Sequence, residues 1–409
     1  MDINLYVVDN SQENSTVMSG GERIAIELCK RWAASGKARI DVIGSNLTEA
    51  LWSPHLAGAP VRFHRIAELK EGENLLFSYL KRVVTGTAFA CRFRMDGQAV
   101  NLVYSASDFW PDSLPALFLY LRNRDRCRWI SGFYLFAPNP LKGFMEKGSW
   151  RLPTLRNTVY WLSQKPIYLV VKYLANAVFV TSDPDIEPFV TSRRGRDRVL
   201  AIRGGVDTAP ASSFDREPET TKNGGHYDAV FVGRFHPQKG VVDLVEIWKM
   251  VTEEIPGARL ALIGAGPLEN EVAKAIARNG LEKEISVLGY MDGDKKYDVF
   301  KRSSLILHPA LYDSGGMAAA EGMAWGLAGV SYDLRALKTY YPKGMVKVPL
   351  GDKASFAGAI VELLKGDPER RRLGDEAREL IMKMWNWESR SGDIWQSLGA
   401  AGLLERRCS

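Results

Sequence analysis

The chain has 409 residues, of which 46% are hydrophobic and 25% are charged, and its formal net charge is +6. This composition excludes a disordered or fibrous chain and fits a soluble globular protein with two or three domains. The four cysteines show no CxxC spacing and the five histidines do not cluster. We therefore expect neither a disulfide framework nor a metal site.

The first half of the chain alternates strand-like and helix-like segments. Residues 3–9 are predicted to form a strand, and residues 20–32 follow with helical spacing of their apolar side chains. Further strands are predicted at 39–44, 61–65, 101–105, 129–135 and 177–181. The alternation favours a parallel sheet covered by helices on both faces, with Gly20 and Gly21 at a helix N-terminus suited to anions.

Location and partners are predicted from the start of the chain and from one basic segment. The chain begins with a strand-like run and lacks the features of a secretory signal, so we expect a cytoplasmic protein. Residues 120–173 contain ten Lys and Arg residues against Asp125 and Glu146, interleaved with large aromatic residues. This mixture favours peripheral contact with an anionic membrane, and the alternative is a solvated face over a core. No nucleic-acid motif accompanies the charge, so no nucleic-acid partner is expected.

The composition shifts at residues 208–225, which are rich in Pro, Ser, Thr and Gly and indicate a linker. The alternation then restarts. Strands are predicted at 228–232, 259–263, 285–289, 305–308 and 328–332, and helices at 241–254, 268–279, 295–303, 317–325 and over most of 353–398. We predict two Rossmann-like domains, 1–205 and 206–385, facing each other across a cleft, with a helix in 386–409 packing back on the first domain.

The stretch after the apolar run 305–307 carries the first candidate site. Asp313 is placed at the carboxyl end of a strand and Glu321 about two turns into the next helix. Gly315 and Gly316 allow the backbone to approach a ligand, and the helix N-terminus offers unpaired N–H groups. Amides suit a phosphate and carboxylates suit hydroxyls, so the stretch is suited to a phosphate ester of a polyhydroxy compound. The alternative is an ordinary strand-to-helix turn.

A second candidate site follows the first strand of the second domain. Gly233 ends that strand, Arg234 and Lys239 are cations beside the turn, and Gly240 opens a helix. A planar guanidinium and a point charge suit the two phosphates of a diphosphate, and the alternative is two solvated cations. The segment 292–294 has the form of a metal-binding D-x-D motif but precedes a helix, which favours a turn with an N-cap.

These spaced residues resemble glycosyltransferase family 4. Residues 233–240 are similar to that family's G-R-x4-K-G element. Residues 309–321 are similar to its P-S-x-x-E-x7-E element, with Asp313 in place of the first Glu, and the D-S-G-G sequence resembles one branch of the family. The segments 20–23, 205–207, 263–268 and 288–290 also resemble the family, and the likeness is strongest over 227–332.

The resemblance implies a GT-B fold and a retaining, metal-independent transfer of a sugar from a nucleotide-diphosphate sugar, with no cofactor. By this likeness Arg234 and Lys239 hold the diphosphate, Asp313 contacts hydroxyls of the transferred sugar, and Glu321 contacts the ribose. The implied donor-binding residues are Gly20, Gly21, Gly233, Gly264, Leu288, Gly289, Tyr290, Ser314, Gly315, Gly316 and Met317.

The implied acceptor is lipid-linked, a polysaccharide or another glycan at the cytoplasmic membrane face. Two alternatives remain, namely a non-catalytic GT-B subunit that binds a nucleotide sugar, and a nucleotide-sugar epimerase on the same fold. Three departures from the family pattern bear on the first alternative. They are Asp313 itself, Ser314 and Gly315 in place of Gly-Phe, and the absence from residues 129–136 of the His that the family often has near the end of a first-domain strand.

Overall fold

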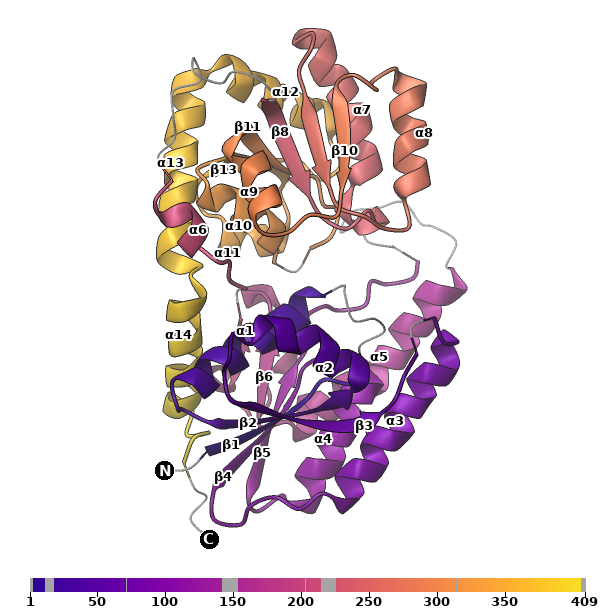
Figure 1. Ribbon diagram of the computed structural model, residues 1–409, viewed down its shortest axis with the longest axis vertical. Helices are drawn as coiled ribbons and strands as arrows, with labels where there is room; N and C mark the ends of the chain where they lie inside the picture. Colours follow the sequence, from indigo (N-terminus) through magenta and orange to yellow (C-terminus); the bar gives the residue numbers. More distant parts are fainter. Residues whose placement is uncertain are drawn as a thin grey trace. The chain divides into compact units, whose positions relative to one another are not determined.

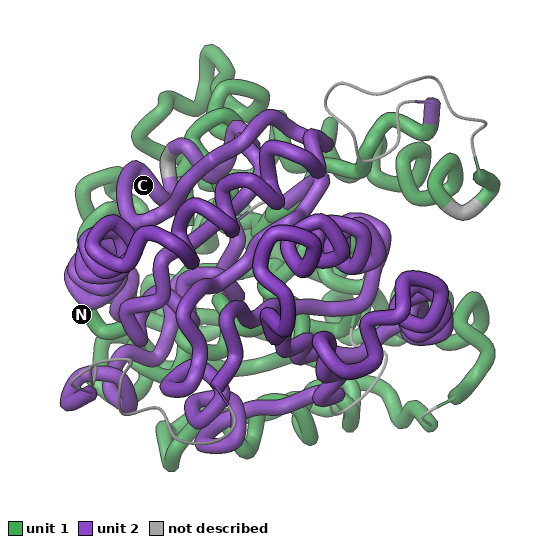
Figure 2. The backbone as a smooth tube through the Cα atoms, turned by 90° about the horizontal axis from the view of Figure 1, so that it is seen from above, with its two compact units in different colours: residues 1–140, 152–204, 387–409 green, residues 141–151, 205–386 purple. Residues whose placement is uncertain are grey.

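We describe the protein from a computed structural model that covers residues 3–11, 18–70, 72–141, 154–202, 204–214, 226–313 and 315–405. The chain divides into two compact units (Figure 2). Unit 1 contains residues 1–140, 152–204 and 387–409, and unit 2 contains residues 141–151 and 205–386. Each unit is an α/β domain built on a parallel sheet, which confirms the predicted fold class.

In the described part of unit 1, seven parallel strands form a sheet in the order β3-β2-β1-β4-β5-β6-β7 (Figure 1). The strands are β1 (Ile3–Val8), β2 (Arg39–Ser45), β3 (Val61–Ala67), β4 (Val100–Ser105), β5 (Cys127–Gly132), β6 (Ala177–Val180) and β7 (Val199–Ala201). Every residue of β4 is buried. Such a buried run is typical of a strand covered by helices on both faces.

The helices of unit 1 are α1 (Gly20–Ala34), α2 (Asn46–Trp52), α3 (Leu75–Arg92), α4 (Trp110–Arg122), α5 (Leu155–Leu174) and α14 (Trp387–Ala400). Strands β2 and β3 are added on one side of β1, and strands β4 to β7 are added on its other side. Right-handed crossovers therefore place α1 and α2 on one face of the sheet and α3, α4 and α5 on the other.

The C-terminal helix α14 packs against α1 in unit 1. The indole N–H of Trp32 donates a hydrogen bond of 2.9 Å to the carbonyl of Ser391, and its ring lies 5.1 Å from the ring of Trp395. Helix α1 itself begins with a capping box, because the Ser19 side chain accepts from the backbone N–H of Glu22 while the Glu22 carboxylate accepts from that of Ser19.

In the described part of unit 2, six parallel strands have the order β10-β9-β8-β11-β12-β13. The strands are β8 (Tyr227–Val232), β9 (Leu260–Ile263), β10 (Ile285–Gly289), β11 (Ser303–His308), β12 (Ala328–Tyr332) and β13 (Met345–Val348). The helices are α6 (Ala209–Ser212), α7 (Val241–Glu254), α8 (Glu269–Asn279), α9 (Asp294–Lys301), α10 (Met317–Ala324), α11 (Arg335–Tyr340), α12 (Lys353–Lys365) and α13 (Asp367–Met384).

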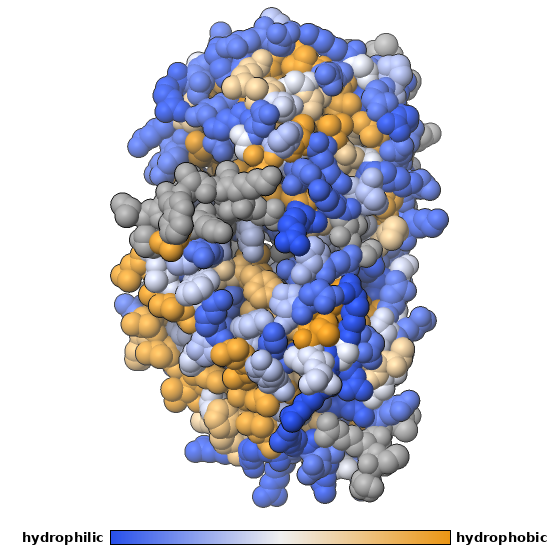
Figure 3. Space-filling view, turned by 180° about the vertical axis from the view of Figure 1, so that it is seen from behind, coloured by the Kyte–Doolittle hydropathy of each residue, from blue (hydrophilic) through white to orange (hydrophobic). Residues whose placement is uncertain are grey.

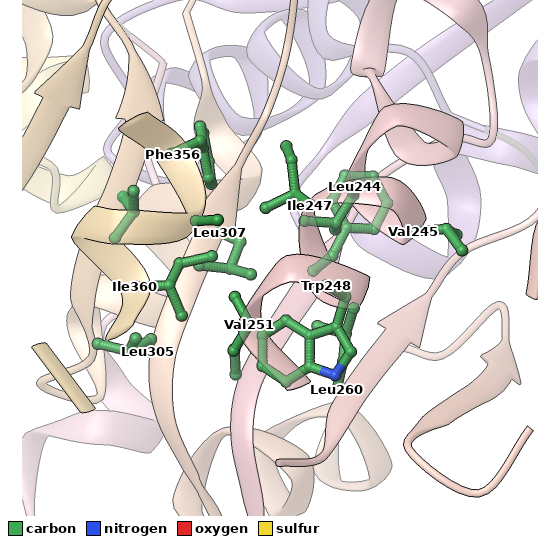
Figure 4. Close-up of a cluster of buried hydrophobic side chains, with 14 of the residues drawn as sticks. Leu244, Val245, Ile247, Trp248, Val251, Leu260, Leu305, Leu307, Phe356 and Ile360 are labelled. Carbon is green, nitrogen blue, oxygen red and sulfur yellow. The ribbon is translucent and has the colours of Figure 1, made fainter. Parts of the chain in front are cut away.

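The largest core of unit 2 lies between its sheet and the helices α7 and α12. Figure 4 shows side chains of α7, α12 and β11 facing one another in this core. Trp248 is fully buried there, and its indole N–H donates to the carbonyl of Ala258 at 3.3 Å. This packing fixes the sheet from which the loops of the candidate site extend.

Four short elements were not predicted from the sequence, and one of them is helix α11 (Arg335–Tyr340), which follows the last predicted strand of unit 2. Strands β7 and β13 have three and four residues and lie at the edges of their sheets, where few cross-strand neighbours impose a pattern. Helix α6 lies inside the predicted linker, whose residues 215–225 are outside the described residues.

Candidate functional site

The two sequence motifs of unit 2 lie at the topological switch point of its sheet. Strands β8 and β11 are hydrogen-bonded neighbours, but the chain proceeds from β8 to β9 on one side and from β11 to β12 on the other. In open α/β sheets the loops diverge at this point and ligands bind at the carboxyl ends of the two strands. Residues 233–240 directly follow β8, and residues 309–316 directly follow β11.

The loops that follow β8 and β11 are bonded to each other. The backbone N–H of Leu311 donates to the carbonyl of Gln238 at 2.9 Å. Gly240 has a φ of +66°, and a Cβ at this position would lie 2.1 Å from the carbonyl oxygen of Pro309. A glycine is thus required where the two loops touch, independently of any ligand.

Asp313 joins the two motifs through its carboxylate. Its Oδ2 lies 2.6 Å from Nζ of Lys239 and 3.0 Å from Nε2 of His308, and its Oδ1 accepts from the backbone N–H groups of Gly315 and Gly316, both at 3.2 Å. Burial alone would raise the pKa of Asp313, but Lys239 and His308 together hold it well below its usual range. The ionised carboxylate therefore has both oxygens engaged.

Helix α10 begins directly after the turn that Asp313 holds. Gly316 is its N-cap with a φ of +59°, and the carbonyl of Gly316 accepts from the hydroxyl of Tyr341 at 2.5 Å. Because Asp313 already binds the Gly316 N–H, the amides next in line are those of Met317 and Ala318. The N–H groups of these two residues have no acceptor within the helix, so they can donate to an anion. Ser314, the remaining predicted residue of this turn, is outside the described residues.

The two cations of the β8 loop differ in their surroundings. The Arg234 side chain is exposed, and none of the described residues forms an ion pair with it that would hold it in place. Lys239 is fixed by Asp313, with 24% of its side chain exposed. One of its three N–H donors is used in this pair, so the ammonium group keeps donors for a second anion.

The predicted glycines at the carboxyl ends of β8, β9 and β10 are linked by backbone hydrogen bonds. The Gly233 N–H donates to the carbonyl of Ile263 at 3.0 Å, and the Gly264 N–H donates to the carbonyl of Gly289 at 2.8 Å. A Cβ on Gly264, whose φ is +147°, would lie 1.9 Å from the carbonyl oxygen of Gly233. Beside these glycines, Leu288 packs against a core cluster and Tyr290 is 69% exposed.

Glu321 is bound to a lysine that the sequence analysis did not single out. Nζ of Lys296 lies 2.9 Å from Oε2 of Glu321 and 2.8 Å from Oδ1 of Asp292. Burial lowers the pKa of Lys296, but the two carboxylates outweigh burial and the pKa is raised. Lys296 is therefore a buried cation that fixes one oxygen of Glu321.

Residues 292–294 form the expected turn with an N-cap before helix α9, but no aspartate side chain makes the cap. The cap residue of α9 is Gly293, with a φ of +59° and no side-chain cap hydrogen bond. Asp292 is held instead by the ammonium group of Lys296, four residues further along the chain.

In unit 1 the predicted glycines lie at the corresponding switch point, between β1 and β4. Gly20 is the first residue of α1, and a Cβ on Gly21 would lie 2.8 Å from Cδ2 of Tyr134, just after β5. Gly21 therefore allows α1 to pack closely against an aromatic ring. The positions of the two units relative to each other are not described, so the predicted closure of Gly20 and Gly21 over a diphosphate stays a prediction.

The same switch point contains buried acids that the sequence analysis missed. Asp9 directly follows β1, is fully buried, and its Oδ2 accepts from the indole N–H of Trp52 at 2.6 Å. Asp112 is also fully buried, and its Oδ1 accepts from the backbone N–H of Asn10 at 2.6 Å. Burial raises the pKa of Asp112 to about 7 and that of Asp9 well above its usual range. For Asp9 the available signal was an acidic residue at the end of an apolar strand, whereas Asp112 lies in helix α4.

These acids predict a loss of stability as the pH rises. The folded protein keeps a proton on Asp112 up to about pH 7, whereas the unfolded chain releases it near the ordinary value of about 3.9. The folded state therefore binds more protons over this window, and stability present at low pH is lost as the pH rises through about 7. We expect the Tm of unit 1 to be lower at pH 8 than at pH 5, and Asp112→Asn to flatten this dependence. The exposed control Asp298→Asn should leave the dependence unchanged; equal slopes for the two variants would contradict the assignment.

The comparison with solved structures agrees with the fold described above. Two doubly wound parallel sheets define the GT-B fold, and the structure of Anabaena Alr3699/HepE in complex with UDP and glucose superposes with a TM-score of 0.69. That structure is 14% identical in sequence, and the match covers 97% of this chain and 99% of that one. At this identity the likeness establishes the fold alone.

The family comparison concerns unit 2. Residues 213–380 match the family described as glycosyl transferases group 1. Glycogen synthase from Mycobacterium tuberculosis is 23% identical over 215 residues, covering 52% of this chain and 51% of that protein. Phosphatidyl-myo-inositol mannosyltransferase from Mycobacterium leprae is 30% identical over 162 residues, covering 39% and 42%. The chain spans about half the length of the curated relatives it matches.

Proposed function

We propose that this protein is a retaining glycosyltransferase of family 4, in the D-S-G-G branch, that uses a nucleotide-diphosphate sugar as donor. The observation that carries the proposal is the pairing of Lys239 with Asp313 at the switch point of unit 2. It joins the two motifs, leaves Arg234 exposed beside them, and lies next to the open amides of Met317 and Ala318. The match of residues 213–380 to glycosyl transferases group 1 supports the same assignment.

The proposed chemistry depends on stabilising a leaving diphosphate. As the bond between the anomeric carbon and the phosphate oxygen breaks, negative charge grows on the diphosphate. Arg234, Lys239 and the N-terminus of α10 offer positive charge and N–H donors to it, so no metal ion is needed for this task. The acceptor oxygen bonds to the anomeric carbon from the same face, and its proton passes to the leaving phosphate oxygen. Configuration is thereby retained.

Asp313 has a different part in this proposal from the one implied by the family resemblance. Its two oxygens already bind Lys239, His308 and two backbone amides, which leaves little capacity for sugar hydroxyls. We propose that Asp313 positions Lys239 and the turn before α10 for the diphosphate. An Asp, one methylene shorter than Glu, keeps the carboxylate back against the loop where these groups lie.

Glu321 is proposed to bind the donor ribose, with Lys296 as its positioning residue. Lys296→Met should raise the KM for donor by about tenfold to a hundredfold, the effect of one lost charge-assisted hydrogen bond. The kcat should change little, because the interaction serves ground state and transition state alike. Lys296→Arg should restore part of the affinity. Lys295→Met, which removes an exposed ammonium group from the same helix, is the control; equal effects at both positions would argue against the role of Lys296.

The function is tested first by ligand stabilisation and then by turnover. Because a relative of the same fold is described with UDP and glucose, UDP-sugars come first in a thermal-shift panel, followed by GDP- and ADP-sugars. Donor hydrolysis is then measured without acceptor. We expect one nucleotide class to raise the Tm and its sugar to be released slowly. Stabilisation without release would favour the non-catalytic subunit, and interconversion of the sugar on an intact donor would favour the epimerase. No stabilisation by any of them would contradict donor binding.

We further propose that the acceptor is lipid-linked, a polysaccharide or another glycan, met at the cytoplasmic face of a membrane. A relative named for a phosphatidyl-myo-inositol acceptor supports a lipid-linked compound. No helix in the described parts of the chain is both long and apolar enough to cross a bilayer. Membrane contact is predicted in residues 120–173, of which 142–153 are outside the described residues. Trp129 and Phe133 from that segment are buried in the core of unit 1, so these aromatic residues do not form the contact.

A further inference from the structure

Helix α5 exposes a stripe of apolar side chains along its full length. The members of this stripe are spaced alternately by four and three residues, which places them on one side of a helix. They are Leu155, Val159, Leu162, Pro166, Leu169 and Tyr173, all exposed, with Leu155 at 81%. The opposite side of α5 supplies Ile167 and Val171 to the core of unit 1. A helix that is apolar on its solvent side as well as its core side requires a partner surface.

A second group of exposed apolar residues lies on α3. Its members are between 54% and 69% exposed, namely Leu75, Leu76, Phe77, Leu80 and Val84. The start of α4 joins α3 to α5, because the backbone N–H of Trp110 donates to the hydroxyl of Tyr79 at 3.2 Å and its indole N–H donates to the carbonyl of Ser163 at 2.8 Å. We call the exposed apolar residues of α3 and α5 the apolar face. Figure 3 shows hydrophobic residues gathered on this side of unit 1.

The charge around the apolar face has one sign. Helices α3, α4 and α5 contain seven Lys and Arg residues, of which Arg82 is fully buried, and the only acid in these helices is the buried Asp112. Two of the cations lie over aromatic rings on α5, with Nζ of Lys165 4.5 Å from the ring of Trp161 and that of Lys172 5.5 Å from the ring of Tyr168. Cations at the border of an apolar surface fit a partner that is apolar and anionic. A second copy of the chain would oppose like charges.

We propose that the apolar face docks on an anionic lipid bilayer, with α5 lying in the plane of the interface. The stripe on α5 enters the boundary between head groups and acyl chains, and Lys165 and Lys172 reach lipid phosphates while their stems stay on the apolar side. A helix of 20 residues is about 30 Å long, so several lipids contact it together.

The topology of unit 1 gives this docking a consequence for the acceptor. As the crossover helix that follows β5, α5 begins at the carboxyl edge of the sheet, where ligands of doubly wound sheets bind. Docking along α5 brings that edge to the membrane surface, which suits a lipid-linked acceptor. This inference rests on the proposed function only in placing the protein at a membrane. The docking surface itself does not depend on the transfer chemistry.

The test is co-sedimentation of the full chain with phosphatidylcholine vesicles, with and without phosphatidylglycerol, in the absence of donor and acceptor. We expect binding to the anionic vesicles and weak binding to the neutral ones. Leu162→Ser combined with Leu169→Ser should weaken binding at least about tenfold, since each buried methylene contributes about 0.8 kcal/mol. The control Val287→Ser removes a residue that is 49% exposed in unit 2 and should bind as wild type does.

Each alternative result overturns the proposal. Wild type that stays in the supernatant with anionic vesicles, or a double variant that still binds fully, excludes this docking surface. Self-association that is lost in the double variant, measured by sedimentation velocity without vesicles, would assign the apolar face to a second copy. Nucleotide stabilisation of the double variant is measured in parallel. A double variant that is still stabilised by nucleotide but no longer binds vesicles supports docking. Wild type that shows neither nucleotide stabilisation nor vesicle binding would also contradict the proposed function.

Discussion

Arg234→Ala should abolish sugar transfer without changing stability, whereas Lys239→Met should abolish transfer and also destabilise unit 2. Both cations face the growing charge of the leaving diphosphate, so each loss should lower kcat/KM by about a hundredfold or more. Arg234 is exposed and its removal should change the free energy of unfolding by less than about 0.5 kcal/mol. Removal of Lys239 leaves Asp313, whose side chain is 7% exposed, without its nearest cation, which should cost about 3 kcal/mol.

Urea unfolding and single-turnover kinetics measure the two effects separately. A double variant, Lys239→Met with Asp313→Asn, should be less destabilised than the sum of its single changes, because the two side chains interact directly. Lys239→Arg keeps the charge and should retain part of both stability and activity. The account fails if Arg234→Ala transfers sugar at the wild-type rate, or if Lys239→Met and Asp313→Asn are additive in stability.

Gly264→Ala should prevent unit 2 from folding stably. The added Cβ would lie 1.9 Å from the carbonyl oxygen of Gly233, and the φ of +147° is in the region that only glycine adopts readily. Backbone and loop must both shift, and we expect a loss of more than about 4 kcal/mol. Gly264 is one of the linked glycines at the carboxyl ends of β8, β9 and β10, so the site would be lost together with the fold.

Gly280→Ala is the matched control for this change. Gly280 caps the C-terminus of α8 with a φ of +65°, and a Cβ there meets nothing within 4 Å. The cost of the left-handed conformation alone is about 1 kcal/mol. Thermal unfolding followed by circular dichroism, together with limited proteolysis, compares the two variants. Similar Tm values for both would show that the close contact at Gly264 is relieved cheaply.

Periodicity predicted those elements whose apolar pattern is set by burial against the sheet. Helix α7 occupies the predicted range 241–254, because its buried residues recur on one side and Gly240 ends the preceding loop. Strands β10 and β12 likewise match their predicted ranges, 285–289 and 328–332. The short edge strands β7 and β13 escaped prediction because three or four residues do not establish a period.

The position of the candidate site could be predicted from the sequence, but the ion-pair partners of its charged residues could not. The spacing of glycines, cations and carboxylates after strands indicated loops at the carboxyl edge of a sheet, and the strand order brings two of these loops together. The partners of the charges depend on tertiary contacts. Lys296 shares the apolar face of its helix with Val299 and Phe300, and the exposed Lys295 beside it does not, but only the tertiary fold shows that Lys296 is buried against Glu321. Asp313 was likewise expected to face a sugar, and the structure places it against Lys239 and His308.

The central claim is that the diphosphate of a nucleotide binds at the switch point of unit 2. Isothermal titration calorimetry with UDP, GDP and ADP, each beside its monophosphate, tests it most directly. We predict that one diphosphate binds at least about tenfold more tightly than its monophosphate, and that Arg234→Ala removes this difference. Equal affinity for diphosphate and monophosphate, or an unchanged preference in the variant, would contradict the account.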